Sequence, residues 1–139
     1  MTMRLHVFAS SEYIKEHGLP MTPEDLDKHR IVVYGEDASP PVADLDWLLR
    51  AGAASRKPRP AALKVNNIYG IYRVVRSGLG IGALPDYMSR HAANLVEVLP
   101  ELRGPSYDAY FVYPEALRDS KRIAVFRDFL LRMFAEDGP

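Results

Sequence analysis

The chain has 139 residues, 47% of them hydrophobic, and its 18 basic and 18 acidic side chains leave a formal net charge of zero. This length suffices for one domain with a sizeable core, or for part of a two-lobed domain, and the balanced charge argues against a free-standing nucleic-acid-binding module, whose affinity comes largely from basic contacts to phosphates. The sequence contains no cysteine, which excludes disulfides, thiolate metal sites and a cysteine nucleophile.

The first part of the chain predicts two strands separated by two short helices. Residues 4–9 alternate in a way that is typical of a strand. Ser10, or the serine after it, can cap a helix that runs to His17 and ends at a glycine. Thr22 precedes a proline and two acids, which favours a second helix because acids suit the positive end of the helix dipole. The β-branched residues 30–34 predict the second strand.

Loops dominate the next part of the sequence. Residues 36–44 contain prolines and acids and predict an exposed loop, whereas residues 45–50, with the only tryptophan, predict a strand. Residues 51–60 predict another loop, in which the basic run Arg56-Lys57-Pro58-Arg59 is expected to be solvated. Residues 62–65 predict a further strand.

The most informative stretch follows, and it predicts a helix, a glycine stop and a buried strand. Asn67 is a suitable helix N-cap, and Gly78 suits the left-handed conformation that ends many helices. Residues 81–84 are apolar on both faces, as in a parallel strand covered by helices, and Pro85 can open the next helix. The apolar residues on one face of the expected helix are Ile68, Ile71, Tyr72 and Val75.

The C-terminal part predicts two more strands and a long helix. After the proline a helix is expected to run to about Ala92, followed by strands over residues 95–99 and 107–113. Residues 120–135 predict an amphipathic helix with one buried apolar stripe, because apolar residues recur there at three- and four-residue spacing. Strands that alternate with helices indicate an α/β layer fold.

Several segments, in this order, resemble the effector-binding, or substrate-binding, domain of LysR-type transcriptional regulators. Each motif is weak alone, but together they cover nearly the whole chain. They are Phe8-Ala9-Ser10-Ser11-Glu12-Tyr13-Ile14 with Pro23-Glu24-Asp25-Leu26, His29-Arg30-Ile31-Val32-Val33-Tyr34, the Asn67 helix with Gly78-Leu79-Gly80-Ile81-Gly82-Ala83-Leu84-Pro85, Leu95-Val96-Glu97-Val98-Leu99-Pro100, and Val112-Tyr113-Pro114 with Ser120-Lys121-Arg122-Ile123.

The resemblance implies an α/β fold like that of the type II periplasmic binding proteins. Residues from about 9–85 correspond to the second lobe of the family's domain, and those from about 86–139 to the segment that returns to the first lobe. The family's winged helix-turn-helix, its linker helix and the first half of its first lobe have no counterpart in this sequence. We therefore expect a partial effector-binding domain that lacks a DNA-binding domain of its own.

The same resemblance implies a sensor and not an enzyme. The chain would bind a small-molecule effector, for example a carboxylate, and take part in oligomerisation, while the parent protein regulates transcription. It implies no cofactor and no metal, and DNA contact only through the helix-turn-helix that this chain lacks. With first-lobe elements missing, the apolar face of the C-terminal helix should be partly uncovered, which favours a homodimer or higher self-association.

Family effectors bind in the cleft between the lobes, at loops that follow strands, as is general for open α/β sheets. Ser10 offers a hydroxyl and helix-start N–H groups to an anion, but it is equally a plain helix cap. Tyr34 lines the cleft or, as is commoner for a strand-end tyrosine, belongs to the core with a solvated tip. The ligand-binding candidates carried over by motif are Ser10, Tyr34, Asn66, Asn67, Gly78 and Ile81, with Asn66 the better polar contact and Asn67 the expected cap.

Other motifs do not indicate a catalytic or metal site. The glycine-rich run of residues 78–82 follows a helix and precedes a strand, which is the reverse of a dinucleotide-binding loop, so helix termination and close packing explain it better. The four histidines have no metal-ligand spacing, and no nucleophile, base and acid set is evident.

Two other functions remain open at the level of sequence. A solute-binding component of a transport system uses the same two-lobed fold, and a small enzyme on a similar α/β scaffold cannot be separated by fold alone. The start of the sequence lacks signal-peptide features and no apolar run reaches the roughly 20 residues of a membrane span, so we expect a cytoplasmic protein with no membrane partner.

Overall fold

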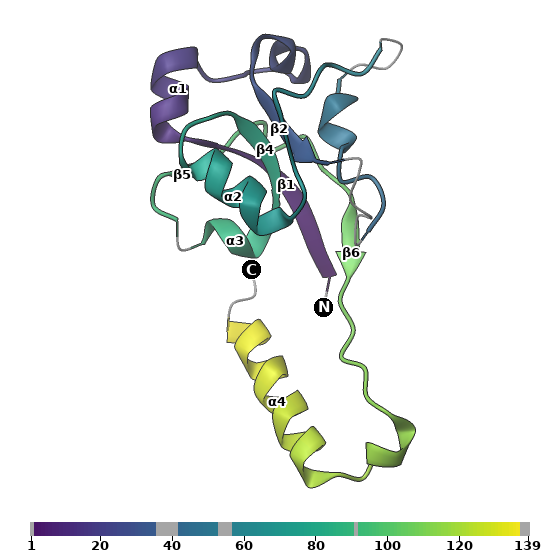
Figure 1. The fold of residues 1–139 in the computed structure, drawn as a ribbon. Helices are drawn as coiled ribbons and strands as arrows, with labels where there is room; N and C mark the ends of the chain where they lie inside the picture. The colour runs from purple at the N-terminus through teal and green to yellow at the C-terminus, as the bar shows by residue number, and fades with distance from the viewer. Residues whose placement is uncertain (1, 36–41, 53–56, 91, 137–139) are drawn as a thin grey trace.

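The computed structural model describes residues 2–35, 42–52, 57–90 and 92–136, and it contains a mixed β-sheet flanked by helices (Figure 1). The strands are β1 (Thr2–Ser10), β2 (Ile31–Tyr34), β3 (Leu63–Val65), β4 (Ile81–Pro85), β5 (Leu95–Glu97) and β6 (Ser106–Asp108). The helices are α1 (Ser11–His17), α2 (Ile68–Arg76), α3 (Asp86–Ser89) and α4 (Lys121–Glu136), with 3-10 turns η1 (Pro23–Lys28), η2 (Trp47–Leu49) and η3 (Glu115–Leu117).

Strand direction in the sheet decides where the candidate residues lie. The strand order is β3-β2-β4-β1-β5, and β6 pairs with the first residues of β1. β2 runs parallel to β3 and β4, whereas β1 is antiparallel to β4, with Leu5 opposite Pro85 and Phe8 opposite Gly82. The carboxyl ends of β2, β3 and β4 therefore share one edge of the sheet with the start of β1.

The pleat of the sheet divides its apolar side chains between two cores. Val7, Ile31 and Val33 face one side, where they pack with the residues of α1, η1 and η2. Phe8 and Val32 alternate with them and face the other side, where α2 covers them. This two-sided burial explains why the central strands read as continuous apolar runs.

The expected helix, stop and strand after residue 66 are confirmed. The Asn67 side-chain oxygen accepts a hydrogen bond from the Gly70 N–H at 2.6 Å and so caps α2. Ile71 and Val75 are the buried residues of α2, and Gly78 has a φ of 77°, where a Cβ would be unfavourable. The glycines here shape the chain, as the sequence indicated.

Gly80 allows the closest backbone approach in this stretch. A Cβ on Gly80 would lie 2.5 Å from the Arg30 carbonyl oxygen, so Gly80→Ala should lower the free energy of unfolding by about 2 kcal/mol, because the backbone must shift. Gly35→Ala is the matched control, since its Cβ would have 3.9 Å to the nearest atoms and should change stability by less than about 0.5 kcal/mol. Urea unfolding measures both, and equal losses in the two variants would contradict the steric explanation.

One strand prediction is wrong and another is too long. Residues 45–50 form turns and η2 and not a strand, because Leu45, Leu48 and Leu49 have the spacing of a helical turn and bury together on the sheet. The strand expected over 107–113 is limited to β6, because within the described residues it pairs only with β1 and the chain beyond Asp108 has no neighbouring strand.

The prediction that the basic run of residues 56–59 is solvated is wrong for Arg59, which is buried. Its guanidinium contacts Asp27 and the backbone oxygens of Leu48 and Ala51, so it holds η1 and η2 together. Lys57 of the same basic run is exposed, as expected. Arg56 and most of the loop expected over 36–44 lie outside the described residues.

The ends of two helices differ from expectation. α3 ends at Ser89 and not near Ala92, while Pro85 is the last residue of β4 and precedes the helix. α4 forms where expected, but the buried stripe predicted for it is wrong, because none of its described side chains is buried. Among the described residues, no helix is both long and apolar enough to cross a membrane.

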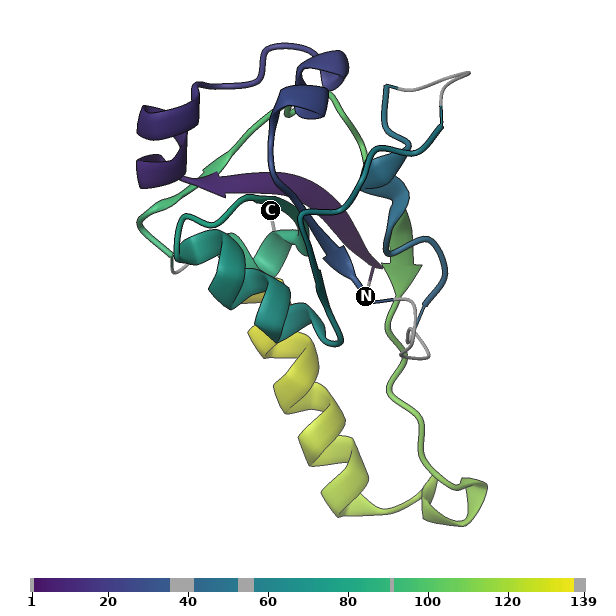
Figure 2. The ribbon, with the colours of Figure 1, turned by 45° about the horizontal axis from the view of Figure 1, so that its top comes forward.

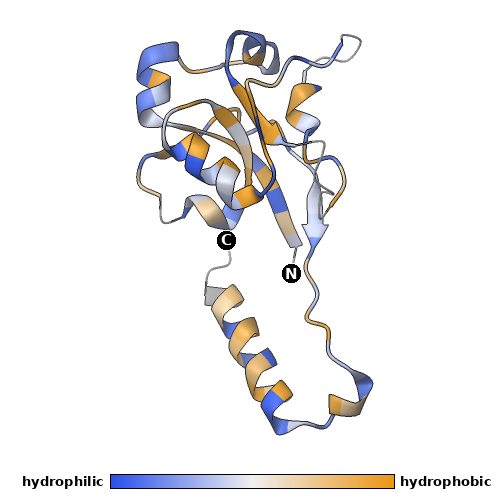
Figure 3. Cartoon of the chain, viewed as in Figure 1, coloured by the Kyte–Doolittle hydropathy of each residue, from blue (hydrophilic) through white to orange (hydrophobic). Residues whose placement is uncertain are grey.

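The placement of α4 explains why its described side chains are not buried. It lies away from the sheet, connected to β6 by an extended segment and η3, in both views of the ribbon (Figures 1 and 2). Apolar residues run along much of its length (Figure 3). The stripe that the sequence predicted therefore exists, but among the described residues it is covered only in part, by the segment that contains Phe111.

Candidate functional site

Three adjacent strands end at the same edge of the sheet, and each is followed by or ends in a polar residue. Tyr34 ends β2, and in the parallel register it lies opposite Val65, the last residue of β3. Asn66 and Asn67 follow directly, and Asp86 follows the last residue of β4. We call the residues Tyr34, Asn66, Asn67 and Asp86 the ligand edge, because ligands of open α/β sheets bind at the carboxyl ends of such strands.

The two asparagines of the ligand edge hold one another. The Asn67 Nδ2 group donates to Asn66 Oδ1 at 3.1 Å, while Asn67 Oδ1 is used to cap α2. Asn66 is exposed, it accepts this hydrogen bond through Oδ1, and its Nδ2 group donates to none of the described residues. Asn67 is therefore a structural residue that orients Asn66, and Asn66 presents hydrogen-bond donors beside the start of α2.

Tyr34 and Asp86 complete the edge from its other two strands. Tyr34 is half-buried, and its ring packs against both cores, as expected for a strand-end tyrosine. Asp86 is also half-buried and accepts a hydrogen bond from the Tyr87 N–H at 2.9 Å. The sequence reading missed Asp86, although a signal existed, because β4 was predicted as a parallel strand and Asp86 is the residue that follows it.

The other three candidates lie at the opposite edge. Ser10 ends β1, which is antiparallel to β4, so it lies near the start of β4, where Ile81 pairs with Ile31. A Cβ on Gly78 would lie 3.3 Å from Ser10 Oγ, which places these two residues together. Ser10 and Ile81 are both fully buried.

The six candidates therefore lie at two opposite edges of the sheet and not at one. Asn67 begins α2 and Gly78 follows its end, and a nine-residue helix separates them by about 13 Å. The cause is strand direction, which reverses between β1 and β4. Ser10 acts as the helix cap that was its alternative reading, since Ser10 Oγ accepts a hydrogen bond from the Tyr13 N–H at 3.1 Å.

The start of α1 already contains an anion of its own. The pKa of Glu12 lies below its ordinary value, chiefly because its carboxylate accepts a hydrogen bond from its own backbone N–H, with smaller contributions from Ser11, Asn94 and Ser10. The groups that the sequence offered to an anionic effector at Ser10 are thus shared with a side chain of the same helix.

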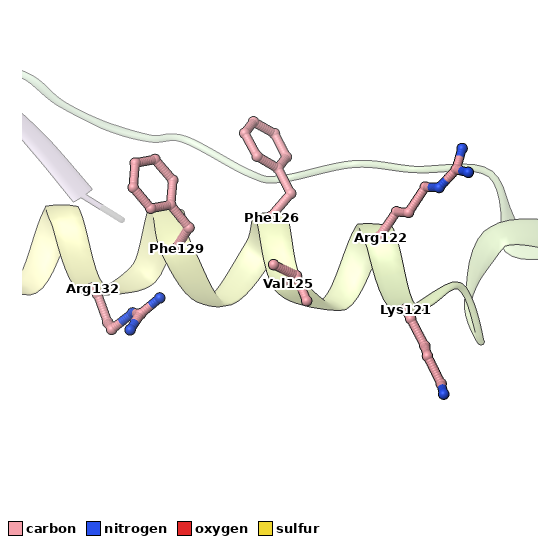
Figure 4. A pocket seen from close by; sticks show the side chains of 6 residues that line it. All are labelled: Lys121, Arg122, Val125, Phe126, Phe129 and Arg132. Carbon is pink, nitrogen blue, oxygen red and sulfur yellow. The ribbon is translucent and has the colours of Figure 1, made fainter.

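Apart from the ligand edge, an apolar surface lies along α4 (Figure 4). Phe126 and Phe129 point to the same side of the helix. The rings of Phe126 and Phe111 pack edge to face, with their centroids 5.7 Å apart. This depression is open to solvent and is lined by Lys121, Arg122, Val125, Phe126, Phe129 and Arg132. It has no buried polar group in it, so its chemistry is that of a packing surface with a basic rim.

The comparisons with known proteins agree with this architecture. The family model described as the LysR substrate binding domain matches residues 1–135. The chain belongs to the LysR substrate-binding domain family. The resemblance seen in the sequence is thereby confirmed, and the described residues contain no group of three or more histidine, aspartate or glutamate side chains that could hold a metal.

Relatives of this LysR domain are transcriptional regulators. An uncharacterized HTH-type transcriptional regulator of Haemophilus influenzae is 27% identical over 117 residues, which are 81% of this chain and 39% of the relative. The probable HTH-type transcriptional regulator LtrA of Klebsiella pneumoniae is 33% identical over 113 residues, 73% of this chain and 33% of the relative. The chain thus spans between a third and two-fifths of the length of these relatives.

A solved structure confirms the fold of the domain. The regulatory domain of CrgA, a LysR-type transcriptional regulator from Neisseria meningitidis, superposes with a TM-score of 0.77 at 24% identity, over 95% of this chain and 65% of that one. The fold is the α/β type II periplasmic-binding-protein-like fold that the sequence predicted. About a third of the CrgA domain has no counterpart here.

Proposed function

We propose that this chain is the effector-sensing part of a LysR-type transcriptional regulator and that the ligand edge forms one wall of its effector site. The observation that carries the proposal is the convergence of Tyr34, Asn66 and Asp86 at neighbouring strand ends, beside the start of β1. This is the edge from which β6 and the segment towards α4 leave the sheet (Figure 1). Family membership and the names of the relatives support regulation of transcription over solute transport.

The effector we propose is a small molecule with a carboxylate. Asn66 offers amide N–H donors, and the adjacent N-terminus of α2 carries a partial positive charge, which favours an anionic oxygen. Tyr34 supplies an apolar ring beside these donors, a combination typical of small-molecule sites. Binding without catalysis is proposed, because the ligand edge brings together no nucleophile with a base.

The parent protein is proposed to combine this sensing part with others. We propose that residues from about 9–85 form the second lobe and those from about 86–139 the returning segment, of which β5 pairs with β1 in the same sheet. DNA contact is assigned to a helix-turn-helix elsewhere in the parent, and paired copies of the domain would re-aim it when the effector favours one arrangement. The cytoplasm is the proposed location, since there the effector and DNA meet.

A thermal-shift screen of aliphatic and aromatic carboxylates against the chain tests this site. A bound carboxylate should raise the melting temperature in a concentration-dependent way. Asn66→Asp should abolish this shift, because it replaces amide donors with a negative charge that repels the ligand. Asn66→Ala should weaken binding by about tenfold, the effect of losing one hydrogen bond to a charged group.

Asn94→Ala is the matched control, because Asn94 is the same residue type at the opposite edge, where its Nδ2 group donates to the Arg76 carbonyl oxygen. Its ligand-induced shift should equal that of the unchanged chain. Shifts that vanish in the Asn94 variant and persist in Asn66→Asp would overturn the proposed site. An in-frame helix-turn-helix in the DNA upstream of the Met1 codon would support the regulator, and a signal peptide there would contradict it.

A further inference from the structure

Three aromatic rings meet where α1 packs on the junction between η1 and β2. The rings of Tyr13 and His17 are stacked, with centroids 4.3 Å apart and planes inclined by 8°. The centroids of the Tyr13 and His29 rings are 5.7 Å apart. Tyr13 is the one described residue of α1 that is buried, at 1% exposure. This residue is therefore the main anchor of α1 on the rest of the lobe.

Hydrogen bonding at the Tyr13 hydroxyl fixes the protonation state of its neighbour. The Arg30 N–H donates to the Tyr13 oxygen at 2.9 Å, and His29 Nδ1 lies 3.1 Å from the same oxygen. The hydroxyl has a single proton, and because the Arg30 N–H already donates to its oxygen, we assign His29 Nδ1 as the acceptor of that proton. That nitrogen must then be unprotonated, so the neutral ring carries its proton on Nε2.

A proton on His29 Nδ1 would break this arrangement. The Tyr13 oxygen would face two N–H donors, and its own proton would be left without an acceptor in a buried position. Leaving a buried polar group unsatisfied costs free energy. His17 Nδ1 lies 3.3 Å from the Tyr13 carbonyl oxygen and its ring stacks on the Tyr13 ring, so two titratable rings contact one anchor.

The surrounding charges act in the same direction. The pKa of His29 lies below its ordinary value, chiefly because the ring is desolvated, and next because His17 repels a proton there. Lys28 adds repulsion, and Asp25 partly opposes these effects. These three groups lie on α1 and η1, two of the elements that the cluster joins.

We propose that Tyr13, His17 and His29 form a pH-responsive latch that holds α1 against the η1–β2 junction while His29 is neutral and loosens α1 when His29 takes up a proton. The folded state then binds fewer protons at His29 than the unfolded chain does. Stability from the latch is complete above the ordinary histidine pKa of about 6.5 and is lost as the pH falls through the lower value of the folded chain.

Amide hydrogen exchange of the full chain, read by NMR at pH 7.5 and pH 5.5 and corrected for intrinsic rates, tests the latch. The amides at the end of α1, including the Gly18 N–H that donates to Ile14, should lose protection by about fivefold at the lower pH relative to those of α2. In the His29→Asn variant, the protection of these α1 amides should change by less than about twofold between the two pH values, because an amide oxygen accepts the Tyr13 proton but does not titrate.

His6→Asn is the matched control, because His6 bonds to Glu97 from β1 and lies outside the cluster. In this variant, the α1 amides should still lose about fivefold of their protection at pH 5.5. Tyr13→Phe removes the shared hydroxyl and should show weak α1 protection at both pH values, which keeps the test usable if the His29 variant folds poorly. Protection of α1 that is the same at both pH values in the unchanged chain, or an acid loss that persists in His29→Asn and Tyr13→Phe, would overturn the proposal.

Discussion

Replacing Arg59 with methionine is expected to lower the free energy of unfolding by about 2–3 kcal/mol. Its side chain is 6% exposed, and its Nη2 and Nε atoms lie 2.8 and 2.9 Å from Asp27 Oδ1. Breaking a buried ion pair typically costs 3–5 kcal/mol, and the lower figure follows because the Asp27 side chain is 43% exposed and can be solvated.

The backbone contacts of Arg59 add to this cost. Arg59 Nη1 donates to the carbonyl oxygens of Leu48 at 2.7 Å and Ala51 at 2.9 Å. Both carbonyls would lose a donor in the methionine variant, and methionine has no polar group to replace it. The same guanidinium therefore joins η1 through Asp27 to the end of η2, across segments far apart in the sequence.

Lys57→Met is the matched control, since Lys57 lies in the same loop and is exposed. It should change the free energy of unfolding by less than about 0.5 kcal/mol. Urea unfolding followed by tryptophan fluorescence measures both variants, because Trp47 lies in η2 beside the contacts of Arg59. A loss in Arg59→Met no larger than that in Lys57→Met would show that the buried pair does not hold these turns.

The unchanged chain is expected to self-associate through α4, and Phe126→Glu combined with Phe129→Glu should abolish that association. Val125, Phe126 and Phe129 are 67%, 51% and 47% exposed, so the helix presents a continuous apolar face. Contiguous apolar patches of this kind favour association in water. Two added carboxylates would have to be desolvated in any such contact, which removes its advantage.

The total surface of the molecule supports this expectation. The accessible area is 9162 Å², whereas a folded monomer of 15.7 kDa is expected to expose about 7,300 Å². The excess, about 1,900 Å² on one chain, exceeds the roughly 800 Å² that each partner buries in a standard-size protein–protein interface. The uncovered face of α4 and the extended segment before η3 account for the unusual shape (Figure 2).

Size-exclusion chromatography with light scattering measures the association state. The control is Leu19→Glu combined with Met21→Glu, which makes the same kind of change at exposed apolar residues of the lobe. That variant should associate like the unchanged chain. A monodisperse monomer for the unchanged chain, or equal dissociation in both double variants, would contradict an interface on α4.

Much of the fold could be predicted because its signals are local. The cap of α2 is Asn67, which contacts the N–H of a residue three positions later, and the stop is Gly78 with its positive φ. Burial of Val32 and Leu84 follows from the apolar character of their own strands. Residues 45–50 were misread because a short apolar run with a tryptophan fits a strand or a turn equally well, and only packing on the sheet separates the two.

The candidate site was only half predictable. Asn66, Asn67 and Tyr34 could be expected at the proposed site because they follow or end strands that the sequence marks clearly. Ser10, Gly78 and Ile81 joined them by motif order, and nothing in the order of motifs reveals that β1 runs antiparallel to β4. Asp86 was missed although it directly follows a strand that the sequence predicts, and its place near Tyr34 depends in addition on which strands are neighbours.

The sequence by itself determined most of the helices and strands, the family and the glycine-shaped turn between α2 and β4, because caps, turn residues and periodicity act over a few neighbouring residues. The tertiary structure decided which strand ends share an edge, that Arg59 is buried against Asp27 from 32 residues away, and that much of α4 is left uncovered. These outcomes depend on strand direction and on contacts between distant segments. A local pattern contains no information about either, so an amphipathic stripe predicts a buried face but not the partner that covers it.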